Sequence, residues 1–200
     1  MMKTFNKTAI QLARACALTS LLAISNGVWS ASLPQLVDDF SKPKVNSLGI
    51  ERQFMSDTVA GGKTQLDSDV SAGMLNIKGN IVPPRGQPGW ASSVLPLGAM
   101  GVPEDASEFT GIRLLVKINS GNMSISANST EISNFDFHSA PVVVPADNQF
   151  HEVKIPFTAM QRGWSEQTPL NSATLNSLSI VAYAMQNAPF DFVIDEVGFY

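Results

Sequence analysis

Three short segments of the sequence combine aromatic, arginine and amide side chains, a mixture suited to recognising a ligand. An aromatic ring supplies apolar area while arginine and amide groups supply directed hydrogen bonds, and sugars are bound by such combinations. Each residue taken alone could be structural, with Trp90 and Trp164 closing the ends of a fold and Arg85 paired with a nearby acid. The three segments together favour a binding surface, and its candidate residues are Arg85, Trp90, Asn128, His138, Arg162 and Trp164.

Motifs of the common catalytic sites do not occur in the sequence. It has two histidines, His138 and His151, and no His-Glu-x-x-His that would hold a catalytic zinc ion. A Gly-x-Ser-x-Gly nucleophile turn is also lacking. Hydrolysis of a glycosidic bond needs two placed carboxylates, and no pair stands out among the 17 acidic residues. We therefore expect a protein that is not an enzyme, with an enzyme acting on glycans as an alternative.

Alternation of apolar and polar residues predicts that β-strands position these segments. In residues 111–118, for example, every second side chain is aliphatic, which is typical of a strand with one buried face. Many short strands without a sustained helical period predict an all-β fold, a sandwich or a barrel, with a helical turn only in 170–178. Further strands are expected at 33–40, 73–81, 90–95, 123–128, 153–155, 178–183 and 189–200.

The last expected strand changes parity near its end. Its apolar residues up to Ile194 occupy alternate positions, and those from Val197 onward occupy the other set. A one-residue bulge at 195–196 would return both sets to the core. A strand that simply leaves the edge of its sheet would explain the pattern equally well.

The first thirty residues have the layout of a secretory signal peptide. Three basic residues precede an uncharged apolar stretch at 15–24, which is too short to span a membrane. A mitochondrial presequence is also basic, but it spreads its charges along an amphipathic helix. We expect cleavage of residues 1–30, leaving a single domain over 31–200 in the periplasm or secreted from the cell.

Charge and cysteine content after this cleavage restrict the partners. Removal of three of the 13 basic residues leaves ten against 17 acidic residues, a net charge of −7. We therefore expect no nucleic-acid partner and no membrane insertion after cleavage. Cys16 is the one cysteine and leaves with the signal, so no disulfide and no thiolate metal site remain. A protein without cysteine suits a bacterial periplasm.

Six short segments carry a recognisable order of motifs, at 56–62, 73–80, 89–92, 105–117, 153–160 and 175–198. In this order they resemble the complex I intermediate-associated protein 30 family, also called NADH:ubiquinone oxidoreductase intermediate-associated proteins. The resemblance implies a galactose-binding-like β-sandwich, a jelly roll related in fold to several carbohydrate-binding modules. Ala60 stands where the family usually has methionine.

Related jelly-roll modules often join their first and last strands through calcium, and the resemblance implies such a site here. Acidic pairs open and close the expected domain, and paired terminal strands would crowd these carboxylates together. Hard oxygen ligands favour calcium over a transition metal, so Asp39 and Asp195 are the expected ligands of a structural calcium ion. These acids could instead be solvated, or Lys42 or Lys44 could neutralise them.

These observations predict an exported, non-catalytic binding module that recognises carbohydrate through its polar and aromatic loops. The family name implies assembly of a respiratory complex, which takes place on the matrix or cytoplasmic side, whereas this chain is expected to be exported. The alternative is therefore a periplasmic assembly or chaperone-like factor that uses the same loops on a protein partner.

Overall fold

A computed structural model describes residues 32–145 and 147–200 of the chain. The expected signal peptide, residues 1–30, lies outside the described residues. Within them, no helix is long and apolar enough to cross a membrane. The strands are β1 Leu36–Asp38, β2 Gln53–Ser56, β3 Gln65–Ser71, β4 Met74–Ile81, β5 Gly89–Pro96, β6 Gly111–Ser120, β7 Asn122–Ser129, β8 His138–Val142, β9 His151–Pro156, β10 Leu175–Ala184 and β11 Ala188–Phe199. Three short 3₁₀ helices complete the described part, η1 Asp57–Ala60, η2 Phe157–Ala159 and η3 Ser172–Thr174.

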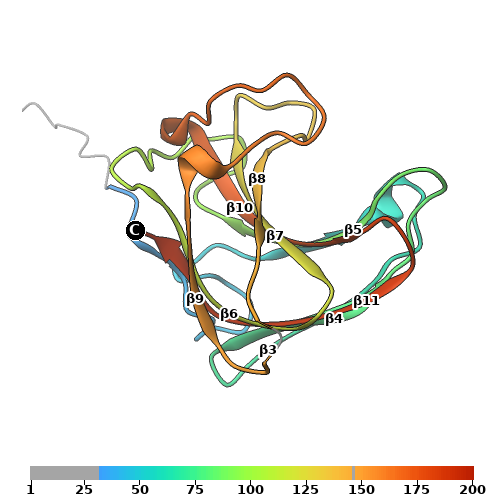
Figure 1. Cartoon of the computed structure of the whole chain (residues 1–200). Coiled ribbons are helices and arrows are strands. Elements are labelled where there is room, and N and C mark those ends of the chain that lie inside the picture. Colours follow the sequence, from blue (N-terminus) through green and yellow to red (C-terminus); the bar gives the residue numbers. More distant parts are fainter. Residues whose placement is uncertain (1–31, 146) are drawn as a thin grey trace, which may run out of the picture. The chain divides into compact units, whose positions relative to one another are not determined.

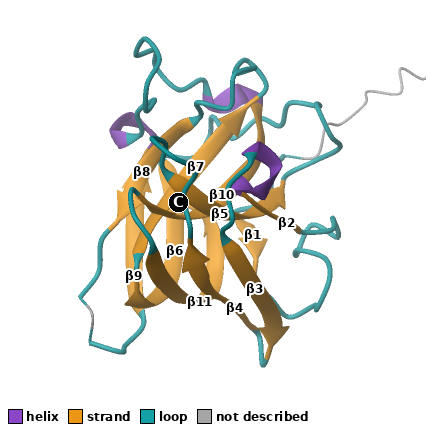
Figure 2. Ribbon diagram, turned by 90° about the vertical axis from the view of Figure 1, so that its right-hand side faces the viewer, coloured by secondary structure: helices purple, strands orange, loops and turns teal. Residues whose placement is uncertain are grey.

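The strands form two antiparallel sheets that pack face to face (Figure 1). One sheet has the order β3-β4-β11-β6-β9, and β1 also pairs with β11. The other sheet has the order β2-β5-β10-β7-β8. Figure 2 shows β9, β6, β11, β4 and β3 of the first sheet next to one another. The predicted all-β sandwich is confirmed.

The hydrophobic core lies between the sheets because the alternation seen in the sequence holds along the central strands. On β6, the side chains of Ile112, Leu114 and Val116 are fully buried, and on β10 those of Leu178 and Ile180 are too. Full burial of an aliphatic side chain of this size stabilises the fold by about 1.5–3 kcal/mol. Their neighbours in sequence point to the outer faces of the two sheets.

The bulge predicted in the last strand is confirmed. Strand β11 shifts its register against β6 between Ile194 and Glu196. Ile194 and Val197 are both fully buried, whereas Asp195 and Glu196 are half-buried. The extra residue therefore keeps apolar side chains on the core side along the whole strand.

Candidate functional site

The outer face of the five-stranded sheet is the candidate site. The sheet curves so that this face lies on the inside of the curve, and we call it the concave face (Figure 1). Residues opposite each other on paired strands share a face, so the register assigns its side chains. They are Gln53 and Met55 on β2, Trp90, Ser92, Val94 and Pro96 on β5, Ser177, Ser179, Val181 and Tyr183 on β10, Asn122, Ser124, Ser126 and Asn128 on β7, and Ser139 and Pro141 on β8.

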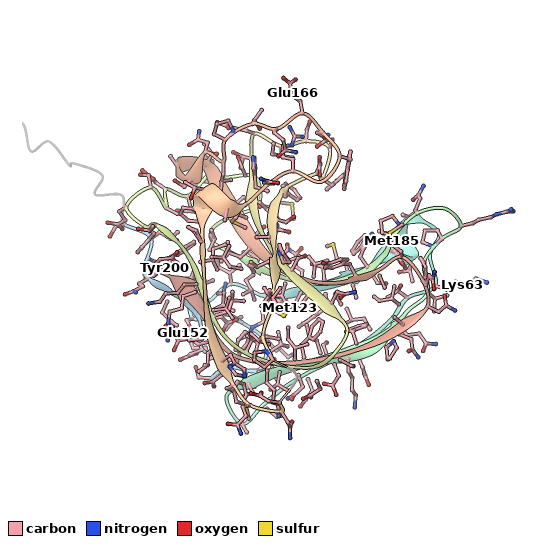
Figure 3. All side chains as sticks on the ribbon, in the orientation of Figure 1. Lys63, Met123, Glu152, Glu166, Met185 and Tyr200 are labelled. Carbon is pink, nitrogen blue, oxygen red and sulfur yellow. The ribbon has the colours of Figure 1, made fainter. Side chains whose placement is uncertain are left out.

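An aromatic pair marks one end of the concave face. Trp90 on β5 and Tyr183 on β10 are directly opposite each other in the register. Trp90 is half-buried and Tyr183 is 37% exposed, so both rings are accessible. Met185 continues this apolar end, and Figure 3 shows it at the opposite end of the curve from Glu166. Such a pair offers a broad apolar platform with an indole N–H and a hydroxyl at its edge.

Serine hydroxyls occupy the middle of the concave face. The hydroxyls of Ser92, Ser124 and Ser126 have no hydrogen-bond partner within the described chain, and none of their oxygens is buried. A hydroxyl that is open to solvent can donate one hydrogen bond and accept others. The middle of the concave face is therefore lined by small side chains whose hydroxyls are free to bind a ligand, with larger side chains around them.

Asn128 lies toward the other end of the concave face and is held by two serines. Its Nδ2 donates to the hydroxyl of Ser177 at 2.9 Å and to that of Ser179 at 2.7 Å. The side chain is buried, and its Oδ1 lacks a partner within the described residues. In this arrangement Asn128 orients the hydroxyls on β10 and does not extend its amide into solvent.

Two loops near this end are joined by the buried carboxylate of Asp136. It accepts hydrogen bonds from the backbone N–H groups of Gly163 at 2.7 Å, Trp164 at 3.1 Å and Ser165 at 2.6 Å. Burial by itself raises the pKa of Asp136, but the hydrogen bonds from Ser165, Trp164 and Gly163 outweigh it and hold the pKa below its ordinary value of 3.8. Arg162 completes this loop clamp, because its Nε donates to the backbone oxygen of Asp136 at 3.1 Å.

The loop clamp exposes two aromatic side chains and holds Arg162 by hydrogen bonds within the protein. Trp164 is 73% exposed and Phe135 is 80% exposed. Arg162 is mostly buried, and its Nη2 donates to Asn134 Oδ1 at 3.1 Å. The structure thus gives Arg162 hydrogen bonds inside the clamp, and the ligand contact expected from the sequence stays a prediction.

His138 also lies elsewhere than expected. It pairs in register with Ala127 on the core side of β8 and is only 2% exposed. Its Nε2 lies 2.6 Å from the backbone oxygen of Thr168, so the ring N–H donates to this carbonyl. His138 therefore anchors the loop that contains Thr168 through this hydrogen bond and does not reach the concave face.

The six residues proposed from the sequence do not converge on one point. Trp90 and Asn128 lie on the concave face, Arg85 is exposed on the loop between β4 and β5, and Trp164 and Arg162 lie on the clamped loop. Sequence reasoning missed Tyr183 and the serines, although the alternation along 178–183 already placed Tyr183 opposite the core residues.

Comparison with known proteins identifies the family. The model of the Complex I intermediate-associated protein 30 (CIA30) family matches residues 39–194. The chain belongs to the CIA30 family. No curated protein matches the sequence.

Solved structures with a similar fold include carbohydrate-binding modules. A family 11 module from a cellulosomal cellulase of Clostridium thermocellum aligns with a TM-score of 0.58 and 18% identity, covering 85% of this chain and 95% of that one. The family 11 module from the same organism in complex with a β-1,3-1,4-mixed-linked tetrasaccharide aligns with a TM-score of 0.55 and 18% identity, covering 85% of this chain and 96% of that one. A family 30 module of another Clostridium thermocellum cellulase aligns with a TM-score of 0.52 and 16% identity, covering 83% of this chain and 95% of that one. At these identities the similarity shows the shared jelly-roll fold.

The Asp-x-Val-x-Gly-Gly segment that this CIA30 member shares with its family has a structural role. Asp57 is fully buried, and it accepts hydrogen bonds from the Thr64 backbone and hydroxyl and from the Trp90 backbone N–H. A Cβ on Gly62 would lie 2.2 Å from the Asp57 carboxyl group, so only glycine fits there. The motif therefore fixes the start of β5 and with it Trp90. Ala60 is exposed, so the methionine usual in the family would face solvent.

The carboxylates at the joined terminal strands have partners of their own. Asp38 is fully buried, and its carboxylate accepts hydrogen bonds from Arg52 Nε at 2.5 Å and Nη2 at 2.7 Å. Glu196 forms an ion pair with Arg113. Asp39 Oδ1 accepts the hydroxyls of Ser41 and Ser47, and these hydrogen bonds, with Ser41 first, lower its pKa. Among the described residues, no three acidic or histidine side chains are placed to share a metal ion. Calcium at Asp39 and Asp195 stays a prediction.

Proposed function

We propose that this CIA30-family protein is a non-catalytic binding module that holds carbohydrate on its concave face. The observation that carries the proposal is the Trp90–Tyr183 pair, which stands beside serine hydroxyls that have no partner within the described chain. Sugar rings have apolar faces and a rim of hydroxyl groups. A surface with exposed aromatic rings and free hydroxyls matches both parts of such a ligand.

The composition of the concave face favours binding over turnover. Hydrolysis of a glycosidic bond uses a pair of carboxyl groups that flank the bond. The register places no aspartate, glutamate or histidine outward on β2, β5, β7, β8 or β10. A sugar chain lying on these five strands would therefore meet no strand carboxylate or histidine that could cleave it.

The fold neighbours support the proposal. Two of them are carbohydrate-binding modules of cellulosomal cellulases, and one of the family 11 structures holds a tetrasaccharide. We infer a periplasmic or secreted location from the signal-peptide layout of residues 1–30. An exported protein there would reach a soluble or wall-bound glycan.

Affinity electrophoresis in gels that contain polysaccharides tests the proposal. We expect retardation of the wild-type protein by at least one glycan, and about a tenfold or greater loss of affinity for Trp90→Ala and for Tyr183→Ala. Phe150→Ala is a matched control, because Phe150 is exposed and lies against Lys117 on the other sheet. Melting curves of all variants establish that the protein is folded. If no glycan retards the folded wild type, carbohydrate recognition is excluded.

A protein partner is the second candidate, and the family supports it. CIA30 is named for the assembly of a respiratory complex. The tip of η1 beside Trp90 also exposes Val59, whose side chain is 77% accessible. A stoichiometric protein recovered by pull-down from periplasmic extract, and lost in Val59→Asp, would favour this function.

A further inference from the structure

Ionisable side chains are divided unequally between the outer faces of the two sheets. Tyr183 is the one titratable group that the register places outward on the five strands of the concave face. The six-stranded sheet carries many charges on its outer face. They include Asp67, Lys78, Arg113, Glu152, Lys154 and Asp191.

The lack of charge on the concave face has a consequence for the ligand. A uronate or sulfate group brought onto it would lose water without gaining a cation, which is unfavourable. The negative net charge of residues 31–200 would also repel a polyanion. A glycan with amino groups would likewise find no carboxylate there. An uncharged glycan pays neither penalty.

Two arginines lie near this face, and neither lines it. Arg162 is mostly buried in the loop clamp, where it donates to Asp136 and Asn134. Arg85 is exposed on the loop beyond Trp90. Lys63 is also exposed, and Figure 3 shows it at the same end as Met185. Arg85 and Lys63 are thus the basic side chains through which an anionic ligand could gain affinity at the aromatic end, and Arg85, on the loop that leads into Trp90, provides a control.

The extent of the concave face indicates the size of the ligand. Five adjacent strands span about 19 Å, and the stretch of β10 from Ser177 to Tyr183 spans about 20 Å. The aromatic pair stands at one end of this stretch and the hydroxyls held by Asn128 at the other. Polar and apolar contacts at this separation suit several consecutive sugar units.

We propose that the ligand is an uncharged polysaccharide, held over several sugar units by stacking on Trp90 and Tyr183 and by hydrogen bonds with the serine hydroxyls. The proposal rests on the carbohydrate-binding function above and adds the charge class and the length of the ligand.

The test compares neutral and anionic polysaccharides in affinity gels. Hydroxyethyl cellulose and carboxymethyl cellulose share a backbone and differ in charge, and mixed-linkage glucan, galactomannan and agarose are set against alginate and pectate. The protein lacking residues 1–30 is run with Trp90→Ala and Arg85→Gln. We expect retardation only by neutral glycans, lost in Trp90→Ala and changed less than about twofold by Arg85→Gln or by 0.5 M sodium chloride.

Each contrary outcome has a distinct meaning. An anionic glycan could retard the protein as strongly as any neutral glycan does, with the retardation weakened by salt and by Arg85→Gln. This outcome would overturn the assigned charge of the ligand but would leave carbohydrate binding supported. Competition by a free monosaccharide as effective as that by a hexasaccharide would overturn the assigned length. If the folded protein binds none of these glycans, the proposed function itself is rejected.

Discussion

The carboxylate of Asp136 accepts the backbone N–H of Trp164 at 3.1 Å, and this contact joins two loops that are far apart in the sequence. The same carboxylate also receives Gly163 and Ser165. Because a charged acceptor inside a buried turn leaves three donors unpaired when it is removed, the loop clamp should depend on it. The exposed indole of Trp164 is therefore positioned by a residue that is itself almost fully buried.

Replacing Asp136 with alanine should loosen the clamped loop and lower the free energy of unfolding by about 2 kcal/mol or more. Hydrogen exchange should rise in peptides covering 162–168 and stay unchanged in peptides from β10. Asp105→Ala is the matched control, because Asp105 is exposed and accepts only a local backbone N–H from Ser107. Equal exchange in the two variants would show that Asp136 does not hold the loop.

The same carboxylate should make the stability depend on pH. The folded-state pKa of Asp136 is lowered from 3.8, so its contribution is complete above that value and is lost as the pH falls through the folded-state pKa. The stability difference between wild type and Asp136→Asn should therefore be constant above about pH 5 and shrink below pH 4. Urea unfolding at several pH values measures it. A difference that grows on acidification contradicts the assigned sign.

Period-2 alternation was enough to predict the sandwich because the central strands are buried on one face only. It failed for β2 and β3, which lie at sheet edges and expose side chains on both faces. It also failed for the edge strand β8, where a histidine, His138, occupies a buried core-side position and Pro141 an outward one. The helical turn expected in 170–178 is the short helix η3.

The candidate site was predicted less well than the fold. Trp90 was recognised by its residue type, but its partner Tyr183 is a neighbour only through strand pairing, which the sequence does not specify. The residue types of Arg162 and His138 favour ligand contact, but in the structure both side chains hydrogen-bond to backbone oxygens that only the folded loops supply. The serines carried no signal of their own, because a serine is common in any turn or strand.

Export predicts a defined N-terminus. Protein recovered from the periplasm should begin near Ala31, because residues 1–30 have the layout of a cleaved signal. N-terminal sequencing or intact mass measures this directly. Recovery of a chain that still begins at Met1 from the cytosol would reject export and return weight to respiratory-complex assembly.

The calcium prediction is tested by thermal melting. An ion that binds only the folded state raises the melting temperature at saturation, and a chelator lowers it. If Asp39 and Asp195 are ligands, Asp39→Asn and Asp195→Asn should each abolish this difference. A wild-type melting curve that is indifferent to calcium and chelator would exclude a stabilising site.

The buried ion pair between Arg52 and Asp38 gives the last prediction. Both side chains are almost fully buried, and Arg52 also donates to the backbone oxygen of Lys42 at 2.9 Å and lies over the ring of Phe40. Arg52→Met would leave the Asp38 carboxylate without its partner, so the free energy of unfolding should fall by about 3–5 kcal/mol.

Two further variants separate charge from packing at this pair. The double variant Arg52→Met with Asp38→Asn should recover part of the loss, because no unpaired charge is left in the core. Arg113→Met should cost much less, since the pairs that Arg113 makes with Glu152 and Glu196 are partly exposed. Urea unfolding of the four proteins decides the matter. If Arg52→Met is no more destabilising than Arg113→Met, Arg52 does not neutralise the buried carboxylate of Asp38.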